Sequence, residues 1–156
     1  MVKTVRVEDV YRLHGTASAV VPDEVPLEDI IIKFAREPNL CGVFLVDPQQ
    51  RFAGVIARAD LLKWSTVVLL GGKISIASSG EAYRIMFATK ARDLRREDWS
   101  FLGVKKTDTL QTALNQMIDS GEDIIPVLDS EGRILGDLRL SEVLLKAIEM
   151  GRQQKQ

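Results

Sequence analysis

Apolar residues recur along this chain at the spacing of a helix in two separate stretches. In both, they fall at positions i, i+3, i+4 and i+7, which places them on one stripe of an amphipathic helix. The first set is Leu27, Ile30, Ile31 and Phe34, and the second is Leu110, Ala113, Leu114 and Met117. Pro26 suits the first turn of the first helix, and Asp108 or Thr109 suits the N-terminal cap of the second. Polar residues at 36–39 and 119–122 predict where each helix ends.

Short apolar runs rich in β-branched residues follow each predicted helix. They are too short for another helix, so we predict buried strands, each followed by a turn and a second strand that pairs back. Pro126 has no N–H to give to a ladder, which predicts a sheet edge or a bulge at that position. The predicted strand pairs are 43–46 with 51–57 and 124–128 with 133–140, and a short strand near Val20-Val21 or near Val104 precedes each half.

A last helix completes each half of the chain. It is predicted to start near Asp60 in the first half and near Glu142 in the second. Glycine suits a left-handed C-terminal cap, so we expect these helices to stop at Gly71-Gly72 and near Gly151.

The order of these elements occurs twice, and individual residues recur with it. An aspartate, an arginine and a glycine keep the same spacing in both halves, and an acidic residue follows each glycine by six positions. These residues are Asp47, Arg51, Gly54 and Asp60 in the first half, and Asp129, Arg133, Gly136 and Glu142 in the second. Such a repeat predicts two similar units related by a pseudo-twofold axis, so that a site at their join occurs twice.

The repeats divide the chain into four parts. We predict a first repeat at 1–71, an insert at 72–89, a second repeat at 90–150 and a polar tail at 151–156. Residues 6–10 and 90–94 also resemble each other near the start of the two repeats. The insert has no counterpart, and a helix-start pattern at 78–81 predicts a short helix over 82–88.

Composition narrows the class of protein. The chain has 156 residues with 46% hydrophobic and 28% charged residues, which is typical of a folded globular protein. Its formal net charge of −1 provides no basic field for nucleic acid or for an anionic membrane. The longest apolar run, 67–70, is far too short to span a bilayer, and the N-terminus lacks an apolar signal core. A single cysteine, Cys41, suits a reducing compartment, so we expect a cytoplasmic protein.

The residue types that carry catalysis or hold metals are scarce. His14 is the only histidine and Cys41 the only cysteine, so neither a zinc cluster nor a Cys-His nucleophile pair has a supporting signature. No pair of carboxylates has a spacing that indicates acid–base chemistry. We therefore predict a protein that is not an enzyme and has no metal site.

The repeated residues resemble the CBS domain, named after cystathionine β-synthase, and the tandem pair called a Bateman module. The second copy carries Val104, Thr107-Asp108-Thr109-Leu110, Ile125-Pro126-Val127-Leu128-Asp129, Gly132-Arg133 and Leu135-Gly136. The first carries Val21 to Leu27, Val46-Asp47, and Gly54 to Leu62. The resemblance excludes only the insert and the tail. It implies an α/β (α+β) fold in which two β-α-β-β-α repeats pack with pseudo-twofold symmetry.

The same resemblance implies a function. Clefts between paired CBS domains often bind AMP, ADP, ATP or S-adenosylmethionine, and the modules regulate a partner rather than catalyse. No obligatory cofactor is implied. With no enzyme or channel fused to the repeats, we expect a stand-alone regulator that acts in trans on an unknown protein. A homodimer is also expected, from the resemblance and from apolar residues at a helix end, which are Trp64, Val67, Val68 and Leu69.

The family's nucleotide motif is a glycine, a Ser or Thr three residues later, and an Asp three residues after that. The resemblance implies that the acid binds ribose hydroxyls and that the hydroxyl helps to hold phosphate. The first copy has Gly54, Ala57 and Asp60 at these positions, and the second has Gly136, Arg139 and Glu142. Both copies therefore lack the hydroxyl.

Each candidate residue has two interpretations. Asp60 either binds ribose or only caps its helix, and Glu142 either binds ribose or only places a favourable charge after Ser141 as cap. Arg58 is either a phosphate ligand or a solvated surface residue. Arg139 either grips an anion or fills the cleft while pairing with Asp137, Asp60 or Glu142. The candidate ligand-binding residues are Gly54, Ala57, Arg58, Asp60, Arg139 and Glu142. If both clefts are degenerate, the alternative function is a structural module for protein interaction.

Overall fold

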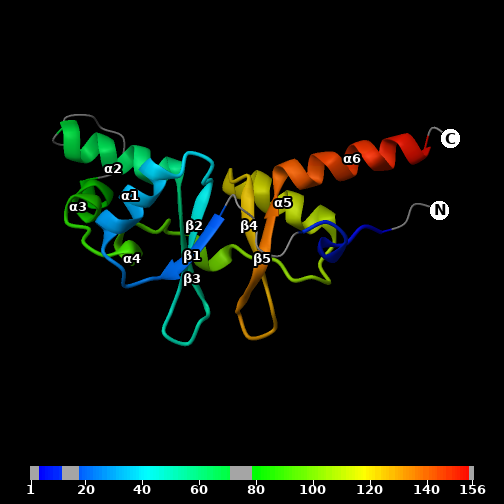
Figure 1. Ribbon diagram of the computed structural model, residues 1–156, viewed down its shortest axis with the longest axis horizontal. Helices are drawn as coiled ribbons and strands as arrows, with labels where there is room; N and C mark the ends of the chain where they lie inside the picture. Colours follow the sequence, from blue (N-terminus) through cyan, green and yellow to red (C-terminus); the bar gives the residue numbers. More distant parts are fainter. Residues whose placement is uncertain (1–3, 12–17, 71–78, 155–156) are drawn as a thin grey trace. The chain divides into compact units, whose positions relative to one another are not determined.

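Two small sheets and the helices beside them make up the chain in the computed structural model, which describes residues 4–11, 18–70 and 79–154 (Figure 1). The chain separates into two compact units. One unit is Thr16–Ser100, called here the first-repeat unit, and the other combines Met1–Gly15 with Phe101–Gln156, called the second-repeat unit. The mixture of helices and strands in a repeated order confirms the predicted fold class.

A three-stranded sheet forms the first-repeat unit together with helices on one side of it (Figure 1). β1 lies parallel to β2, and β2 lies antiparallel to β3. A parallel pair needs a crossover connection, which α1 supplies. The strands are β1 (Ser18–Pro22), β2 (Gly42–Val46) and β3 (Phe52–Ala57), and the helices are α1 (Leu27–Arg36), α2 (Arg58–Leu70), α3 (Ser79–Met86) and α4 (Ala91–Leu94). The predicted strands near Val20 and over 43–46 and 51–57 are therefore confirmed.

The core of the first-repeat unit lies between this sheet and its helices. Every residue of β2 is buried, and this strand lies at the centre of the sheet, paired with β1 on one edge and β3 on the other. Leu27 and Ile30 bring the predicted apolar stripe of α1 into this core. Ile85 of α3 is also buried there, so the helix predicted in the insert contributes to the same core.

An antiparallel pair of strands forms the sheet of the second-repeat unit. Its elements are η1 (Val7–Asp9), η2 (Trp99–Phe101) at the boundary, α5 (Leu110–Ser120), β4 (Ile124–Leu128), β5 (Ile134–Arg139) and α6 (Leu140–Gln154). Thr109 caps α5 by accepting a hydrogen bond from the Thr112 N–H at 3.2 Å. Ala113 and Met117, from the predicted stripe of α5, are buried in this unit's core. Pro126 pairs in register with Asp137 in a two-stranded sheet, which agrees with the edge alternative, whereas the register shift falls after Val127.

The short strand predicted near Val104 is reduced to a single bridge. The Val104 N–H donates to the Pro126 carbonyl at 3.0 Å, and the Leu128 N–H donates to the Val104 carbonyl at 2.7 Å. Extended pairing stops on both sides of this residue. Gly103 has a φ of +124°, and the Lys105 N–H is taken by the Asp108 carboxylate.

The segment before each repeat is tied by the same backbone bonds to the repeat in the other half of the sequence. The Ala91 N–H donates to the Val25 carbonyl at 2.8 Å, and the Leu27 N–H donates to the Thr89 carbonyl at 2.9 Å. In the second-repeat unit, the Val7 N–H donates to Asp108 and the Leu110 N–H to Val5, both at 2.9 Å. The compact units are therefore a different division of the chain from the repeats at 1–71 and 90–150.

The helix ends differ from prediction at one place. α6 continues through Gly151 to Gln154, so the stop predicted near Gly151 is wrong, and the tail from 151 is partly helical. A glycine inside an exposed helix costs only about 1 kcal/mol, which the neighbouring residues outweigh. α2 ends at Leu70, and the predicted stop at Gly71-Gly72 lies outside the described residues. In the described part of the chain, no helix has the length and apolarity that a bilayer crossing needs.

Replacing Gly54 by alanine is expected to destabilise the protein by about 2 kcal/mol or more. Gly54 has a φ of +149°, and an added Cβ would lie 2.7 Å from Arg95 Cδ, so both backbone strain and a clash oppose the change. The free energy of unfolding, measured with denaturant, tests this. The matched control is Gly80→Ala in α3, where an added Cβ meets nothing within 4 Å and helix propensity favours alanine by up to about 1 kcal/mol. Equal effects at the two sites would contradict the prediction.

Candidate functional site

An acidic side chain caps the N-terminus of the last helix in each repeat. Asp60 Oδ2 accepts a hydrogen bond from the Ala57 N–H at 2.8 Å, and Glu142 Oε1 accepts one from the Arg139 N–H at 3.2 Å. Both acids satisfy an amide that the first helical turn leaves without a partner. The capping contact proposed for Asp60 is therefore present, and its ribose-binding role stays a prediction. Ser141 is not the cap of α6, because that helix already begins at Leu140.

Asp60 lies in an electrostatically unusual position. Burial raises the pKa of Asp60 above its usual value of 3.8, while the hydrogen bond from Ala57 and the positive charges of Arg96, Lys63 and Arg84 oppose that rise. A charge alters a pKa in this way only at short range. Asp60 is thus a half-buried carboxylate with arginines near it.

The other candidates of the first copy have separate surroundings. Ala57 is 4% exposed, so its side chain belongs to the core and only its N–H faces Asp60. Gly54 lies against the aliphatic part of Arg95, which needs the space that a side chain at Gly54 would fill. Arg58 begins α2, is exposed, and makes no ion pair within the part of the chain that the structure describes.

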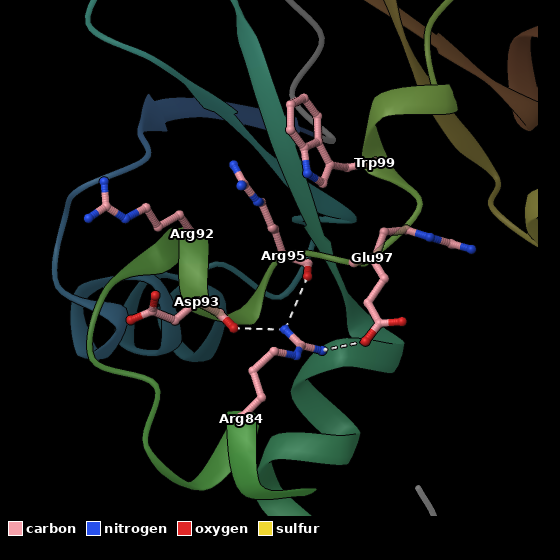
Figure 2. A pocket seen from close by; sticks show the side chains of 7 residues that line it. Arg84, Arg92, Asp93, Arg95, Glu97 and Trp99 are labelled. Atoms are coloured by element: carbon pink, nitrogen blue, oxygen red, sulfur yellow. Dashed lines mark hydrogen bonds and ion pairs between the residues drawn. The ribbon is translucent and has the colours of Figure 1, made fainter. Parts of the chain in front are cut away.

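A pocket of about 340 Å³ opens in the first-repeat unit next to α3 and α4 (Figure 2). Four arginines line it, namely Arg84, Arg92, Arg95 and Arg96. Asp93, Glu97 and Trp99 complete the lining. These residues were not among the predicted site residues, although the density of arginine between 84 and 96 is visible in the sequence.

Neutral oxygens hold Arg84 in the pocket. Its Nη1 donates to the Asp93 carbonyl at 2.8 Å and lies 3.5 Å from the Arg95 carbonyl. Glu97 approaches its Nη2 only to 3.9 Å, and the Glu97 side chain is 76% exposed (Figure 2). The Arg84 guanidinium is therefore positioned by backbone carbonyls rather than by a close ion pair.

Arg95 is held in a similar way. Its Nη1 donates to the Ala53 carbonyl at 2.6 Å, and its guanidinium lies 4.5 Å from the centre of the Trp99 ring. Trp99 is in turn packed edge-on against Phe52 of β3, with ring centres 5.8 Å apart. No carboxylate pairs with Arg95 among the described residues.

The remaining two arginines have acidic partners. Arg92 Nη1 lies 3.2 Å from Glu24 Oε1, and Arg96 binds both carboxylate oxygens of Asp98, with 3.0 Å between Nη2 and Oδ2. The pocket thus contains two arginines neutralised by carboxylates and two held mainly by neutral groups.

The second repeat uses its candidate residues differently. Arg139 Nε lies 3.1 Å from Asp137 Oδ1 and 3.5 Å from Glu142 Oε1. The Asp137 side chain is 2% exposed and that of Arg139 19%, so this network is largely buried. Of the two interpretations of Arg139, the structure shows pairing with Asp137 and Glu142. The two repeats therefore share a fold and a helix cap but not the surroundings of the motif.

A twice-repeated α+β unit with an acid at the start of its last helix defines the class of this protein. The chain belongs to the CBS domain family, which it matches over residues 7–66 and 92–149. No curated protein matches the sequence.

Solved structures with the same fold span nearly the whole chain. A CBS domain-containing protein from Thermotoga maritima is 26% identical, with a TM-score of 0.70 over 92% of this chain and 94% of that one. The protein CBSX2, solved in complex with AMP, is 19% identical, with a TM-score of 0.70 over 94% and 98%. The CBS domain pair of protein MJ0100, solved with 5-methylthioadenosine and S-adenosyl-L-methionine, is 11% identical, with a TM-score of 0.65 over 96% and 99%.

A double-mutant cycle is expected to show strong coupling between Asp137 and Arg139. Removing either charge leaves the other group with fewer partners in a largely buried network, so the coupling energy should be about 1–3 kcal/mol. The free energies of unfolding of Asp137→Asn, Arg139→Gln and the double variant give this value. The control is the exposed pair of Glu131 and Arg133, 3.3 Å apart, for which we expect less than about 1 kcal/mol. A coupling as small as that of the exposed pair would show that the buried network adds little.

Proposed function

We propose that this protein is a non-enzymatic regulator that binds an adenosine-containing ligand at its first repeat and acts on a separate protein in the cytoplasm. The ligand class is AMP, ADP, ATP or S-adenosylmethionine, and none of these is an obligatory cofactor. The observation that carries the proposal is Asp60, a half-buried carboxylate at the motif position of a CBS repeat, with arginines near it.

The contacts of Asp60 support a role in binding ribose. One carboxylate oxygen, Oδ2, accepts the Ala57 N–H. The other oxygen accepts no hydrogen bond from the described residues, which leaves an acceptor for a ribose hydroxyl. A carboxylate accepts through both oxygens, so capping and ligand binding are compatible in one side chain. The related structures of CBSX2 with AMP and of MJ0100 with methylthioadenosine and S-adenosylmethionine support an adenosine ligand for this fold.

The second repeat supports a site in the first repeat alone. Arg139 already contacts both Asp137 and Glu142, so a ligand at this position would have to break a largely buried network. Such a network is costly to open because the separated charges stay partly desolvated. The proposal therefore includes one ligand per chain.

A second candidate function is a module for protein interaction with no ligand. The observations that favour it are the missing hydroxyl at Ala57 and the pairing of Arg139 with its own repeat. In this case the protein would act on its partner through its surface alone.

Asp60→Ala is expected to weaken binding of an adenosine ligand by about 1–3 kcal/mol, because ribose hydroxyls lose a charged acceptor. Isothermal titration calorimetry with AMP, ADP, ATP and S-adenosylmethionine measures this, and wild type should bind one ligand per chain. The control variant is Asp119→Ala, which removes an exposed acid of α5 in the other unit. If none of the four compounds gives heat at near-millimolar concentration, the interaction module becomes the better account.

We also propose a homodimer, for which fewer of the predicted apolar residues are exposed than expected from the sequence. Val67 is buried in the core and Trp64 packs against the same core, so these two residues are not available for a partner. Val68 and Leu69 of α2 are 51% and 80% exposed.

Light scattering should therefore give twice the mass of one chain. Leu69→Glu should shift the species toward monomer, because it places a charge in an apolar contact. The comparison variant is Leu62→Glu on the same helix, at a residue that is 69% exposed and nearer the start of α2. A monomer at all working concentrations would refute the homodimer.

A further inference from the structure

We propose that the pocket of Arg84 and Arg95 is a site for the phosphate groups of a di- or triphosphate, and that it selects ligands by negative charge. The phosphate site is argued from the pocket alone. Naming the ligand as a nucleotide rests on the function proposed above.

Of the two acids that line the pocket, Asp93 already accepts backbone hydrogen bonds and Glu97 makes no close ion pair within the described residues. The Asp93 carboxylate accepts hydrogen bonds from the Lys90 N–H at 3.0 Å and the Thr89 N–H at 3.1 Å. These bonds and the nearby Arg92 charge lower the pKa of Asp93 against the opposing effect of burial. Asp93 therefore meets Arg84 through its carbonyl, and its carboxylate serves the cap of α4. Glu97 is the remaining acid of the lining, and its exposed side chain comes no nearer than 3.9 Å to Arg84 Nη2.

Two guanidinium groups consequently retain capacity for an anion. Arg84 Nε is buried and has no acceptor among the described residues, and its Nη2 has only Glu97 at 3.9 Å. Arg95 has a backbone carbonyl and an aromatic ring as partners and no described carboxylate. Because Arg84 Nε is buried, the donors that a ligand can reach are Arg84 Nη2 and the Arg95 guanidinium, and an oxyanion that accepts from these is stabilised. Guanidinium groups match phosphate because they donate in a planar fork.

The pocket is also arranged before any ligand arrives. Carbonyls of Asp93 and Ala53 fix the Nη1 atoms of Arg84 and Arg95, and Trp99 supports the Arg95 guanidinium from its ring face. Gly54 leaves room for the aliphatic part of Arg95. Long side chains that are already held lose little freedom on binding, which favours affinity.

Charge connects this pocket with Asp60. The positive charges of Arg84 and Arg96 act on the Asp60 carboxyl, so the pocket lies within electrostatic range of the proposed ribose ligand. Ala57 cannot contribute a hydroxyl to a phosphate. In this proposal, Arg84 of α3 and Arg95, which follows α4, take over that contact.

The pocket therefore predicts which adenosine compounds bind. ATP and ADP bring several negative charges to the arginines and are attracted. Methylthioadenosine has no phosphate, and S-adenosylmethionine carries a sulfonium and an ammonium group against a single carboxylate, so the arginines repel its net positive charge. Affinity should rise from methylthioadenosine through AMP to ATP. Added salt should weaken ATP binding most, AMP binding less and methylthioadenosine binding least.

Titration calorimetry with ATP, AMP, methylthioadenosine, S-adenosylmethionine and inorganic tripolyphosphate tests this inference. Arg95→Gln should weaken ATP binding about tenfold or more and leave methylthioadenosine binding unchanged. Arg84→Gln should weaken ATP binding by a similar factor and methylthioadenosine binding less, because Arg84 also acts on Asp60. Arg133→Gln, which removes an exposed arginine of the other unit, is the matched control. Thermal unfolding of each variant checks that it folds. If Arg84→Gln does not fold, the ranking and salt dependence of the wild-type protein still decide.

The outcomes separate the two proposals. If adenosine compounds bind irrespective of charge, or if Arg95→Gln loses ATP and methylthioadenosine alike, the phosphate pocket is refuted and the adenosine site stands. If tripolyphosphate binds, depends on Arg95, and no adenosine compound binds, the pocket stands for a free polyphosphate and the adenosine site is refuted. If nothing binds, both proposals are wrong.

Discussion

The backbone hydrogen bonds between residues 25–27 and 89–91 are the constraint on which the candidate site depends. They join two segments that are far apart in the sequence and fix α4 against the first-repeat core. The chain that leaves α4 then passes β3, where the Arg96 N–H donates to the Val55 carbonyl at 3.1 Å and Arg95 reaches the Ala53 carbonyl. Without that pairing, the arginines of the pocket would have no fixed relation to Asp60. The fold thus positions the site through main-chain bonds that are independent of side-chain identity.

Because those bonds do not depend on side-chain identity, both repeats keep the same backbone pairing although different side chains surround the helix cap. The second-repeat unit repeats the pairing through Val5, Val7, Asp108 and Leu110, and it repeats the acidic helix cap. Around that cap, however, an arginine at the motif position is neutralised by two acids of its own repeat. In the first repeat the motif position is an alanine, and the arginines come from the connecting segment instead. The duplicated fold therefore has different surroundings at the motif position of each repeat.

Local patterns in the sequence predicted the helices and strands. The arginine pocket was not predicted, because it depends on contacts between segments that are distant in the sequence. The stripe at Leu27 and Ile30 identifies α1, since its period depends on neighbouring residues alone. Asp60 could be identified as a candidate ligand because it follows Gly54 by six residues, as in the motif that the family resemblance implies. The pocket had no such signal, because Arg84 and Arg95 meet only after residues 89–91 pair with 25–27. The helix end predicted near Gly151 was wrong because a single exposed glycine costs too little free energy to end a long helix.

The arginines have a consequence for Asp60 that is independent of any contact with phosphate. Burial alone favours the neutral carboxyl, which is a poor acceptor for ribose hydroxyls, and the charges of Arg96, Lys63 and Arg84 counteract that effect on its pKa. A phosphate bound to the arginines would offset part of their charge and so reduce this support. The proposed ribose and phosphate contacts are therefore coupled through one set of charges. Arg84 is the arginine that takes part in both roles, whereas Arg95 serves the anion alone and Arg96, already paired with Asp98, acts on Asp60. A cluster of arginines therefore suits this site better than a single arginine.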